Sequence, residues 1–341
     1  AGFGMTATPA VAFELFGIKF FGAESDAEAV IADPQPYNVT ITVNATGPLE
    51  NVVRNASALV ADQDESASGA AGLLAKARGD YRRIIAALYN EGHYGGAVSI
   101  SVGGVEATKL PPDVNLPDPV EVIIAVDPGP LFHFSGMAIA NQAPATDDPD
   151  DQVELPLSIG FGAGEPARSS VILRAEQLTL EAWRQQGYAK AAIESRNVVA
   201  DHATRLVDVT ITVAPGRRAA FGDITVTGTD RMDPDFVRRQ TGLTVGEEYD
   251  PDELALAQRR LDRLEVFRAA RLEAADSIGA DGLLPYDLIV QELPGRRFGV
   301  GANYSTVDGL GLEAFHLWRN LFGQAERLRL DARVASIAWP I

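Results

Sequence analysis

The sequence predicts an α+β fold, in which three similar repeats in tandem are followed by a short run of antiparallel strands. Three observations lead to this prediction. A strand that ends in Pro-Gly occurs three times, and the prolines, Pro128, Pro215 and Pro294, are 87 and 79 residues apart. Residues with helical spacing lie between these strands, and apolar and polar residues alternate after the last Pro-Gly pair.

Each Pro-Gly pair follows a short apolar strand, at 122–126, 209–213 and 288–290. Proline has no N–H to donate to a strand ladder and glycine tolerates a positive φ, so the pair predicts a turn. The residues after the turn also repeat, because Phe134 and Phe221 are each followed by apolar residues at the third and fifth positions. Each turn therefore leads directly into the first strand of the next repeat.

Apolar residues at helical spacing occur once in each repeat, over 81–89, 171–183 and 251–267. The spacing predicts one apolar stripe on each helix, which covers one face of a small mixed sheet and leaves the other face to solvent. Alternating strands follow the helices, for example at 98–102 and 207–211. Each repeat is thus expected to run strand, helical segment, strand, strand.

The pattern changes after Pro294. Apolar residues alternate with glycine or polar residues over 298–305, and with charged residues over 327–334. This region also carries six arginines and only four acidic residues, although the chain has a net charge of −18. One charged face and one apolar face are typical of an outer-membrane β-barrel strand, but also of an amphipathic hairpin in a soluble sheet.

An open sheet cannot span lipid, because the N–H and C=O groups of its edges would be unpaired there. The residues after Pro294 suffice for only three or four membrane-spanning strands of about 9–11 residues each. We therefore expect either that the sequence is a piece of a longer protein or that these strands do not span a membrane.

The composition argues against several classes of function. The absence of cysteine excludes a disulfide scaffold, a thiol nucleophile and a cysteine-bound metal. The acidic net charge disfavours nucleic acid as a partner. The four histidines share no ligand spacing, the aspartates of 147–151 do not fit a calcium loop, and the glycines of 160–164 lack the lysine of a phosphate loop. We predict no enzyme activity, no catalytic or metal-binding residue and no cofactor.

These patterns divide the chain into five segments. Ala10-Val11-Ala12 has the small-x-small pattern of a signal-peptidase site, so the first segment is either the remnant of a secretory signal or an ordinary flexible terminus. The segments are an N-terminal one (1–36), the three repeats (37–130, 131–219 and 220–296) and the truncated start of a barrel (297–341).

The three repeats, the junction at 295–306 and the turn and strand at 320–328 together resemble the BamA/TamA family of outer-membrane assembly factors. In that family the repeats are POTRA domains. Three repeats resemble the TamA branch more than BamA, which carries five, or two-partner-secretion transporters, which usually carry two. The family's barrel signature would lie beyond Ile341, so no residue of it is carried over.

The resemblance implies a non-enzymatic factor in the outer membrane of a Gram-negative bacterium, with the chain up to about residue 296 in the periplasm. It also implies that the POTRA domains guide unfolded outer-membrane proteins or autotransporters to the barrel by strand augmentation. The implied partners are these clients, a TamB-like protein anchored in the inner membrane, and outer-membrane lipid around the barrel.

The resemblance also implies that the first barrel strand borders a gate where client strands pair, so the gate candidates are Phe298, Val300, Ala302 and Tyr304. Arg296 and Arg297 either lie on a solvated face or orient the junction with the barrel. Three other hypotheses stay open: a soluble periplasmic POTRA-type scaffold, a two-partner-secretion-type transporter, and a periplasmic enzyme that uses a metal at its acidic clusters.

Overall fold

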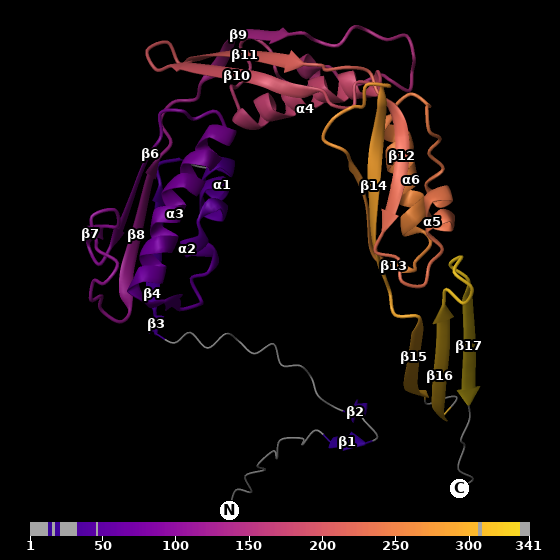
Figure 1. Cartoon of the computed structure of the whole chain (residues 1–341). Helices are drawn as coiled ribbons and strands as arrows, with labels where there is room; N and C mark the ends of the chain where they lie inside the picture. The colour runs from indigo at the N-terminus through magenta and orange to yellow at the C-terminus, as the bar shows by residue number, and fades with distance from the viewer. Residues whose placement is uncertain (1–12, 16–17, 21–32, 46, 306–308, 335–341) are drawn as a thin grey trace, which may run out of the picture. The chain divides into compact units, whose positions relative to one another are not determined.

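The computed structural model describes residues 13–15, 18–20, 33–45, 47–305 and 309–334, with the backbone alone at 13–20, 303–305 and 309–310. The expected signal-peptidase site lies outside these residues. The chain forms two compact units, Ala1–Leu131 and Phe132–Ile341. Figure 1 shows the first repeat in the first unit, and the other two repeats with the last three strands in the second unit.

The first unit contains a four-stranded mixed sheet in the order β4-β8-β6-β7. Strand β8 is central, since β4 pairs with it in parallel and β6 pairs with it in the antiparallel sense. Two short antiparallel pairs lie outside this sheet. Strand β1 pairs with β2, and β3 pairs with β5. The elements are β1 (Phe13–Leu15), β2 (Ile18–Phe20), β3 (Pro34–Gln35), β4 (Tyr37–Val43), α1 (Pro48–Ala56), α2 (Ala58–Ala61), β5 (Ala67–Ser68), α3 (Gly69–Asn90), β6 (Ala97–Val102), β7 (Val105–Glu106) and β8 (Val120–Asp127).

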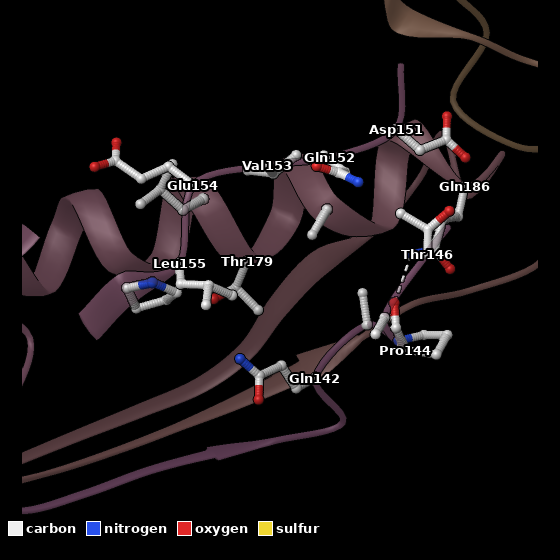
Figure 2. Close-up of a pocket in the computed structure, with 15 residues that line it drawn as sticks. Gln142, Pro144, Thr146, Asp151, Gln152, Val153, Glu154, Leu155, Thr179 and Gln186 are labelled. Carbon is white, nitrogen blue, oxygen red and sulfur yellow. Dashed lines mark hydrogen bonds between the residues drawn. The ribbon is translucent and has the colours of Figure 1, made fainter. Parts of the chain in front are cut away.

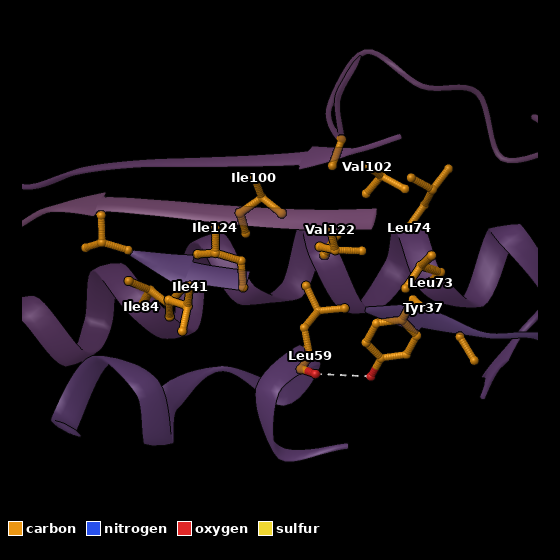
Figure 3. Close-up of a cluster of buried hydrophobic side chains, with 14 of the residues drawn as sticks. Tyr37, Ile41, Leu59, Leu73, Leu74, Ile84, Ile100, Val102, Val122 and Ile124 are labelled. Carbon is orange, nitrogen blue, oxygen red and sulfur yellow. Dashed lines mark hydrogen bonds between the residues drawn. The ribbon is translucent and has the colours of Figure 1, made fainter. Parts of the chain in front are cut away.

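The core of this unit lies between the helices and one face of the sheet (Figure 3). In β8, residues with buried side chains alternate with exposed ones, so Val122 and Ile124 face the helices whereas Ile123 is 48% exposed. Ile84 and Leu88 of α3 are fully buried against them. Each such side chain contributes about 1.5–3 kcal/mol through its transfer from water.

The second and third repeats share a three-stranded topology. In each, the last strand is central, the first strand is parallel to it and the second strand is antiparallel to it. The second repeat contains β9 (His133–Ala140), the short 3-10 helix η1 (Pro156–Ile159), α4 (Ser169–Gln185), β10 (Ala192–Asp201) and β11 (Leu206–Ala214). The third contains β12 (Ala220–Thr227), α5 (Pro234–Thr241), α6 (Pro251–Asp262), β13 (Phe267–Ala274) and β14 (Leu283–Glu292).

Two details of the predicted helices are wrong. The third helical segment ends at Asp262, and Phe267 begins β13, because an apolar edge-strand residue can continue a helical spacing by coincidence. In α4 the buried stripe contains Ile172, Ala175 and Leu178, whereas Leu173 is 44% exposed. The predicted stripe is Val171, Leu173, Leu178, Leu180 and Trp183, and only Leu178 of these is buried, so the buried face is rotated from the predicted one.

The last sheet has the order β15-β16-β17 and is antiparallel throughout. Its strands are β15 (Arg296–Ser305), β16 (Gly309–Arg319) and β17 (Arg327–Val334). The sequence Thr-Val-Asp-Gly at 306–309 also predicts a turn, and of these residues only Gly309 is described. The predicted α+β class, with helix-backed mixed sheets followed by antiparallel strands, is confirmed. Within the described chain, no helix is long and apolar enough to cross a membrane.

Candidate strand-binding edges

The sheets of the second and third repeats each have two edges, because their central strands are β11 and β14. The outer backbone groups of an edge strand can pair with another chain unless something covers them. These edges are therefore the places where the repeats could bind an extended polypeptide.

The edge formed by the first strand of each repeat is partly covered by the chain itself. In the second repeat, the N–H of Phe134 donates to the carbonyl of Glu165 at 2.9 Å, and the carbonyl of Phe134 accepts from Gly164 at 2.8 Å. Phe221 makes the same two bonds with Glu247 and Gly246, both at 2.8 Å. The glycine-containing loops therefore cap the beginning of β9 and β12.

Strand β10 has an outer edge that pairs with no other described strand. It is ten residues long, and the side chains of residues 194–199 are all exposed. Val198 and Val199 are exposed by 37% and 51%, and the segment 197–200 contains no charged residue. Charged residues flank this segment at Glu194, Arg196 and Asp201, so the part of the edge suited to strand addition is the uncharged stretch 197–200 with its exposed valines.

The corresponding edge of the third repeat, β13, differs in its chemistry. It carries Arg268, Arg271 and Glu273 within eight residues. Charged side chains along an edge discourage the addition of a further strand. β10 also carries three charged residues, but its uncharged stretch of four residues, 197–200, is longer than any in β13, where the longest is two. Among the outer edges of these two sheets, β10 is therefore the better suited to bind an extended chain.

A groove follows the second half of β12, beyond the loop that caps its beginning. It lies between Asp223–Val226 of the strand and α5 with the residues that follow it, and has a volume of about 510 Å³. Arg238 and Arg239 line it. The groove is a second place, after the edge of β10, where a strand could lie beside an edge strand, in this case β12.

The predicted gate residues all lie on β15, an edge strand of the last sheet. Phe298 and Val300 are 70% and 83% exposed, and Ala302 is exposed as well. The backbone of Tyr304 pairs with Leu310, and its side chain lies outside the described part. The structure thus brings the four residues onto one strand, and their role at a gate stays a prediction.

The predicted junction residues, Arg296 and Arg297, begin β15 and are exposed. They lie opposite Trp318 and Leu317 in the register with β16, and neither forms an ion pair with another described residue. Their orienting role also stays a prediction.

Other residues make the contacts between the third repeat and the last sheet. Arg319 donates its backbone N–H to the carbonyl of Gly295 at 2.7 Å, and Asp233 donates its own to Gly323 at 2.9 Å. Arg327 forms an ion pair with Glu265. These contacts join residues far apart in sequence, so no local pattern could have indicated them.

Glu292, at the end of β14, holds the segment that precedes α5. Its Oε1 accepts the backbone N–H groups of Asp230, Arg231 and Met232, each at 2.8 Å, and Arg231 lies 3.2 Å from Oε2. Burial by itself raises the pKa of Glu292, but the three N–H donors and the guanidinium outweigh it and lower the pKa below 4.5. The ionised carboxylate is therefore part of the fold at neutral pH.

No group of three or more His, Asp or Glu side chains is placed to hold a metal ion in the described chain. The four histidines do not converge. His93 Nδ1 donates to the carbonyl of Gly129 at 3.1 Å, and His202 packs edge-on against Phe132.

The fold is that of POTRA domains. The chain superposes on POTRA domains 3–5 of BamA from Haemophilus influenzae with a TM-score of 0.53 and 17% identity, over 76% of this chain and 96% of that one. No protein-family model matches the sequence.

Two curated proteins are similar in sequence, both named outer membrane protein assembly factor BamA. The protein from Neisseria meningitidis is 25% identical over 146 residues, which is 43% of this chain and 18% of that protein. The protein from Neorickettsia risticii is 26% identical over 144 residues, or 41% and 19%. The chain thus covers about one-fifth of the length of these relatives. The comparisons support a relationship to the BamA/Omp85 family with its POTRA domains. They do not distinguish the TamA branch of that family from BamA.

Proposed function

We propose that this chain is the POTRA region, with the first barrel strands, of a non-enzymatic factor that assembles or inserts outer-membrane proteins. The similarity to BamA supports the class of activity. The TamA-like role is a finer proposal, supported by the three repeats. Location in the outer membrane, with the repeats in the periplasm, belongs to the same proposal, as do the predicted limits of the five segments.

The observation that carries this proposal is the outer edge of β10. An extended client segment can add to it through backbone hydrogen bonds, which demand little of the client's sequence. Val198 and Val199 offer apolar contacts to the added strand. Such binding suits a varied set of unfolded β-rich clients, including autotransporters, before their strands reach the barrel at β15.

The partners are proposed on the family resemblance. They are the client proteins, outer-membrane lipid around the completed barrel, and a TamB-like protein anchored in the inner membrane. The driving force of assembly is strand pairing and burial of the client in lipid, so the mechanism uses no nucleotide and no metal. A two-partner-secretion-type transporter and a soluble periplasmic scaffold are the alternatives.

The edge is tested with the double variant V198K/V199K in the full-length protein of the producing bacterium. Two lysines on the exposed edge oppose strand addition without touching the core. We expect assembly of client outer-membrane proteins, measured as folded protein in the membrane fraction, to fall at least about fivefold. The control is Ile289→Lys, an equally exposed apolar residue (45%) on the central strand β14. Equal assembly by V198K/V199K and wild type would contradict the proposal.

The same variant separates the alternatives. If the protein is a two-partner-secretion-type transporter, V198K/V199K reduces the release of a single secreted protein, while the assembly of other outer-membrane proteins continues. A soluble scaffold is recovered without detergent and leaves assembly unchanged when 297–341 are deleted. Deletion of the third repeat, 220–296, abolishes client assembly if the repeats act as an arm, and assembly retained after this deletion refutes the arm model.

A further inference from the structure

A groove in the second repeat lies between α4 and the long loop that follows β9 (Figure 2). The loop is fixed at its start, where Trp183 Nε1 donates to the carbonyl of Asn141 at 2.8 Å and Gln186 Nε2 donates to that of Pro144 at 2.8 Å. The groove has a volume of about 260 Å³. This is below the size of most small-molecule sites, about 300–1,000 Å³, and suits a few side chains.

Both walls of the groove carry apolar side chains. Leu178 and Ala182 of α4 form one wall, and Val153, Leu155 and Pro156 of the loop form the other. Leu155 is 66% exposed, so part of this apolar surface faces solvent. Burial of exposed apolar area gives about 25 cal/mol per Å² in favour of an occupant.

The rim of the groove is acidic. Asp151 and Glu154 line it, and Asp147, Asp148 and Asp150 lie in the same loop. None of these five carboxylates forms an ion pair with a described residue. The described chain therefore supplies no cation for them, and a cation of a partner would meet them directly.

Like charges crowd one end of this rim. Burial raises the pKa of Asp151, and Asp148 of the same loop with Asp250 and Glu248 of the third repeat raise it further. An approaching cation would relieve this repulsion. The charge of the rim thus favours a basic occupant and rejects an acidic one.

The walls also decide the backbone conformation of the occupant. One wall is a helix, whose interior N–H and C=O groups are already paired, and the other contains Pro144 and Pro156, which have no N–H. Strand addition has no ladder to extend here, in contrast to β10. An occupant must bind through its side chains, as an amphipathic helix does in an apolar groove.

We propose that this groove docks an amphipathic helix with a basic polar face, presented by a partner protein. The partner's apolar residues at helical spacing enter between Leu178, Ala182 and Leu155, and its lysines or arginines meet Asp151 and Glu154. The groove is separate from the β10 edge, so this inference does not rest on the strand-binding function and can fail or hold independently of it.

The test uses the full chain and a fluorescent synthetic helix of about 18 residues, with leucines at i, i+3, i+4 and i+7 and lysines elsewhere. We expect saturable binding in fluorescence anisotropy. Ala182→Trp, which fills the groove, should weaken binding at least about tenfold. D151N/E154Q should weaken it about fivefold, since two exposed ion pairs are lost.

The controls separate this groove from general attraction to an acidic protein. E165Q/E181Q removes two exposed carboxylates of the same repeat that do not line the groove, and should leave the dissociation constant within about twofold. A peptide with glutamate in place of lysine should not bind. D151K/E154K reverses the charge at the half-buried Asp151 and the exposed Glu154, and it should abolish binding even where Ala182→Trp alters the fold.

Three results overturn the proposal. The first is an equal loss of binding in E165Q/E181Q and D151N/E154Q. The second is binding unaffected by both Ala182→Trp and D151K/E154K. The third is concentration-dependent dimerisation of the chain without peptide that Ala182→Trp abolishes, because the occupant would then be a second copy.

Discussion

At the scale of single residues, two buried carboxylates organise their repeats. Asp80 in α3 is fully buried and accepts hydrogen bonds from the Ser57 hydroxyl at 2.6 Å and from the N–H groups of Ala58 and Leu59 at 3.0 and 3.1 Å. It thereby pairs the N–H groups that begin α2, which have no partner within the helix. Arg83 balances its charge at 2.8 Å.

Replacing Asp80 by alanine should lower the free energy of unfolding of the first repeat by about 3–5 kcal/mol, because three donors lose their acceptor and Arg83 loses its counter-charge. Asp80→Asn keeps one acceptor oxygen and should cost less. Urea denaturation, with hydrogen exchange of the β8 amides as the local probe, measures both. Equal stability of Asp80→Ala and the wild type would show that the network contributes nothing.

Glu292 gives a pH dependence at the same scale. Its pKa is lowered in the folded state, so its stabilising effect is fully present above about 4.5 and is lost as the pH falls through the lower, folded pKa. Glu292→Gln should lower the stability of the third repeat by about 2 kcal/mol at pH 7, and this difference should shrink toward pH 3. Hydrogen exchange of β14 amides across this range measures it. A difference independent of pH would mean that the charge is not involved.

At the scale of elements, periodicity predicted most of the secondary structure. The alternation Val207, Val209, Ile211 and Val213 predicted β11 because one face of the strand is buried and the other is wet. The eight-residue helix α5 was not predicted separately, since two turns carry too few apolar positions to define a period. The rotated face of α4 has a tertiary cause, as packing on the sheet selects which residues are buried.

The glycine-containing strands show why some positions could not be interpreted from sequence. Both first strands shift register after their phenylalanine, between Phe134 and Met137 and between Phe221 and Ile224. A Cβ on Gly222 would lie 2.7 Å from backbone atoms of Leu284 and Pro285. The close approach of β12 to β14 therefore requires glycine there, although nothing in the local sequence indicates it.

Gly222→Ala should accordingly destabilise the third repeat by about 2–4 kcal/mol, because backbone atoms cannot move aside as a side chain can. Gly162→Ala is the control in the second repeat, where the new methyl group meets side chains alone, the end of Leu157 at 3.0 Å and Glu165 at 3.8 Å. Thermal unfolding of the two variants compares them. A smaller effect at Gly222 than at Gly162 would contradict the explanation that the close approach of β12 to β14 requires glycine at position 222.

At the scale of the whole molecule, the sequence located the repeats but not the surfaces that distinguish them. The outer edges of β10 and β13 occupy the same place in two copies of one fold and each carries three charged residues. They differ in how the charges are spaced, since only β10 has an uncharged stretch of four residues with the exposed Val198 and Val199. Which strand lies at an edge follows from topology, which only the folded chain displays. The edge and the groove of the second repeat are therefore products of the tertiary structure.

The most direct test of strand binding is site-specific cross-linking along β10. The chain contains no cysteine, so single cysteines at residues 194–200 are unique sites for disulfide formation with a client carrying one cysteine in a β-strand. Added strands pair with a period of two, so cross-linking should be strong at every second position, with Ile289→Cys on the central strand as the unreactive control. Uniformly weak cross-links along β10, or equal yields at Ile289→Cys, would contradict strand binding at this edge.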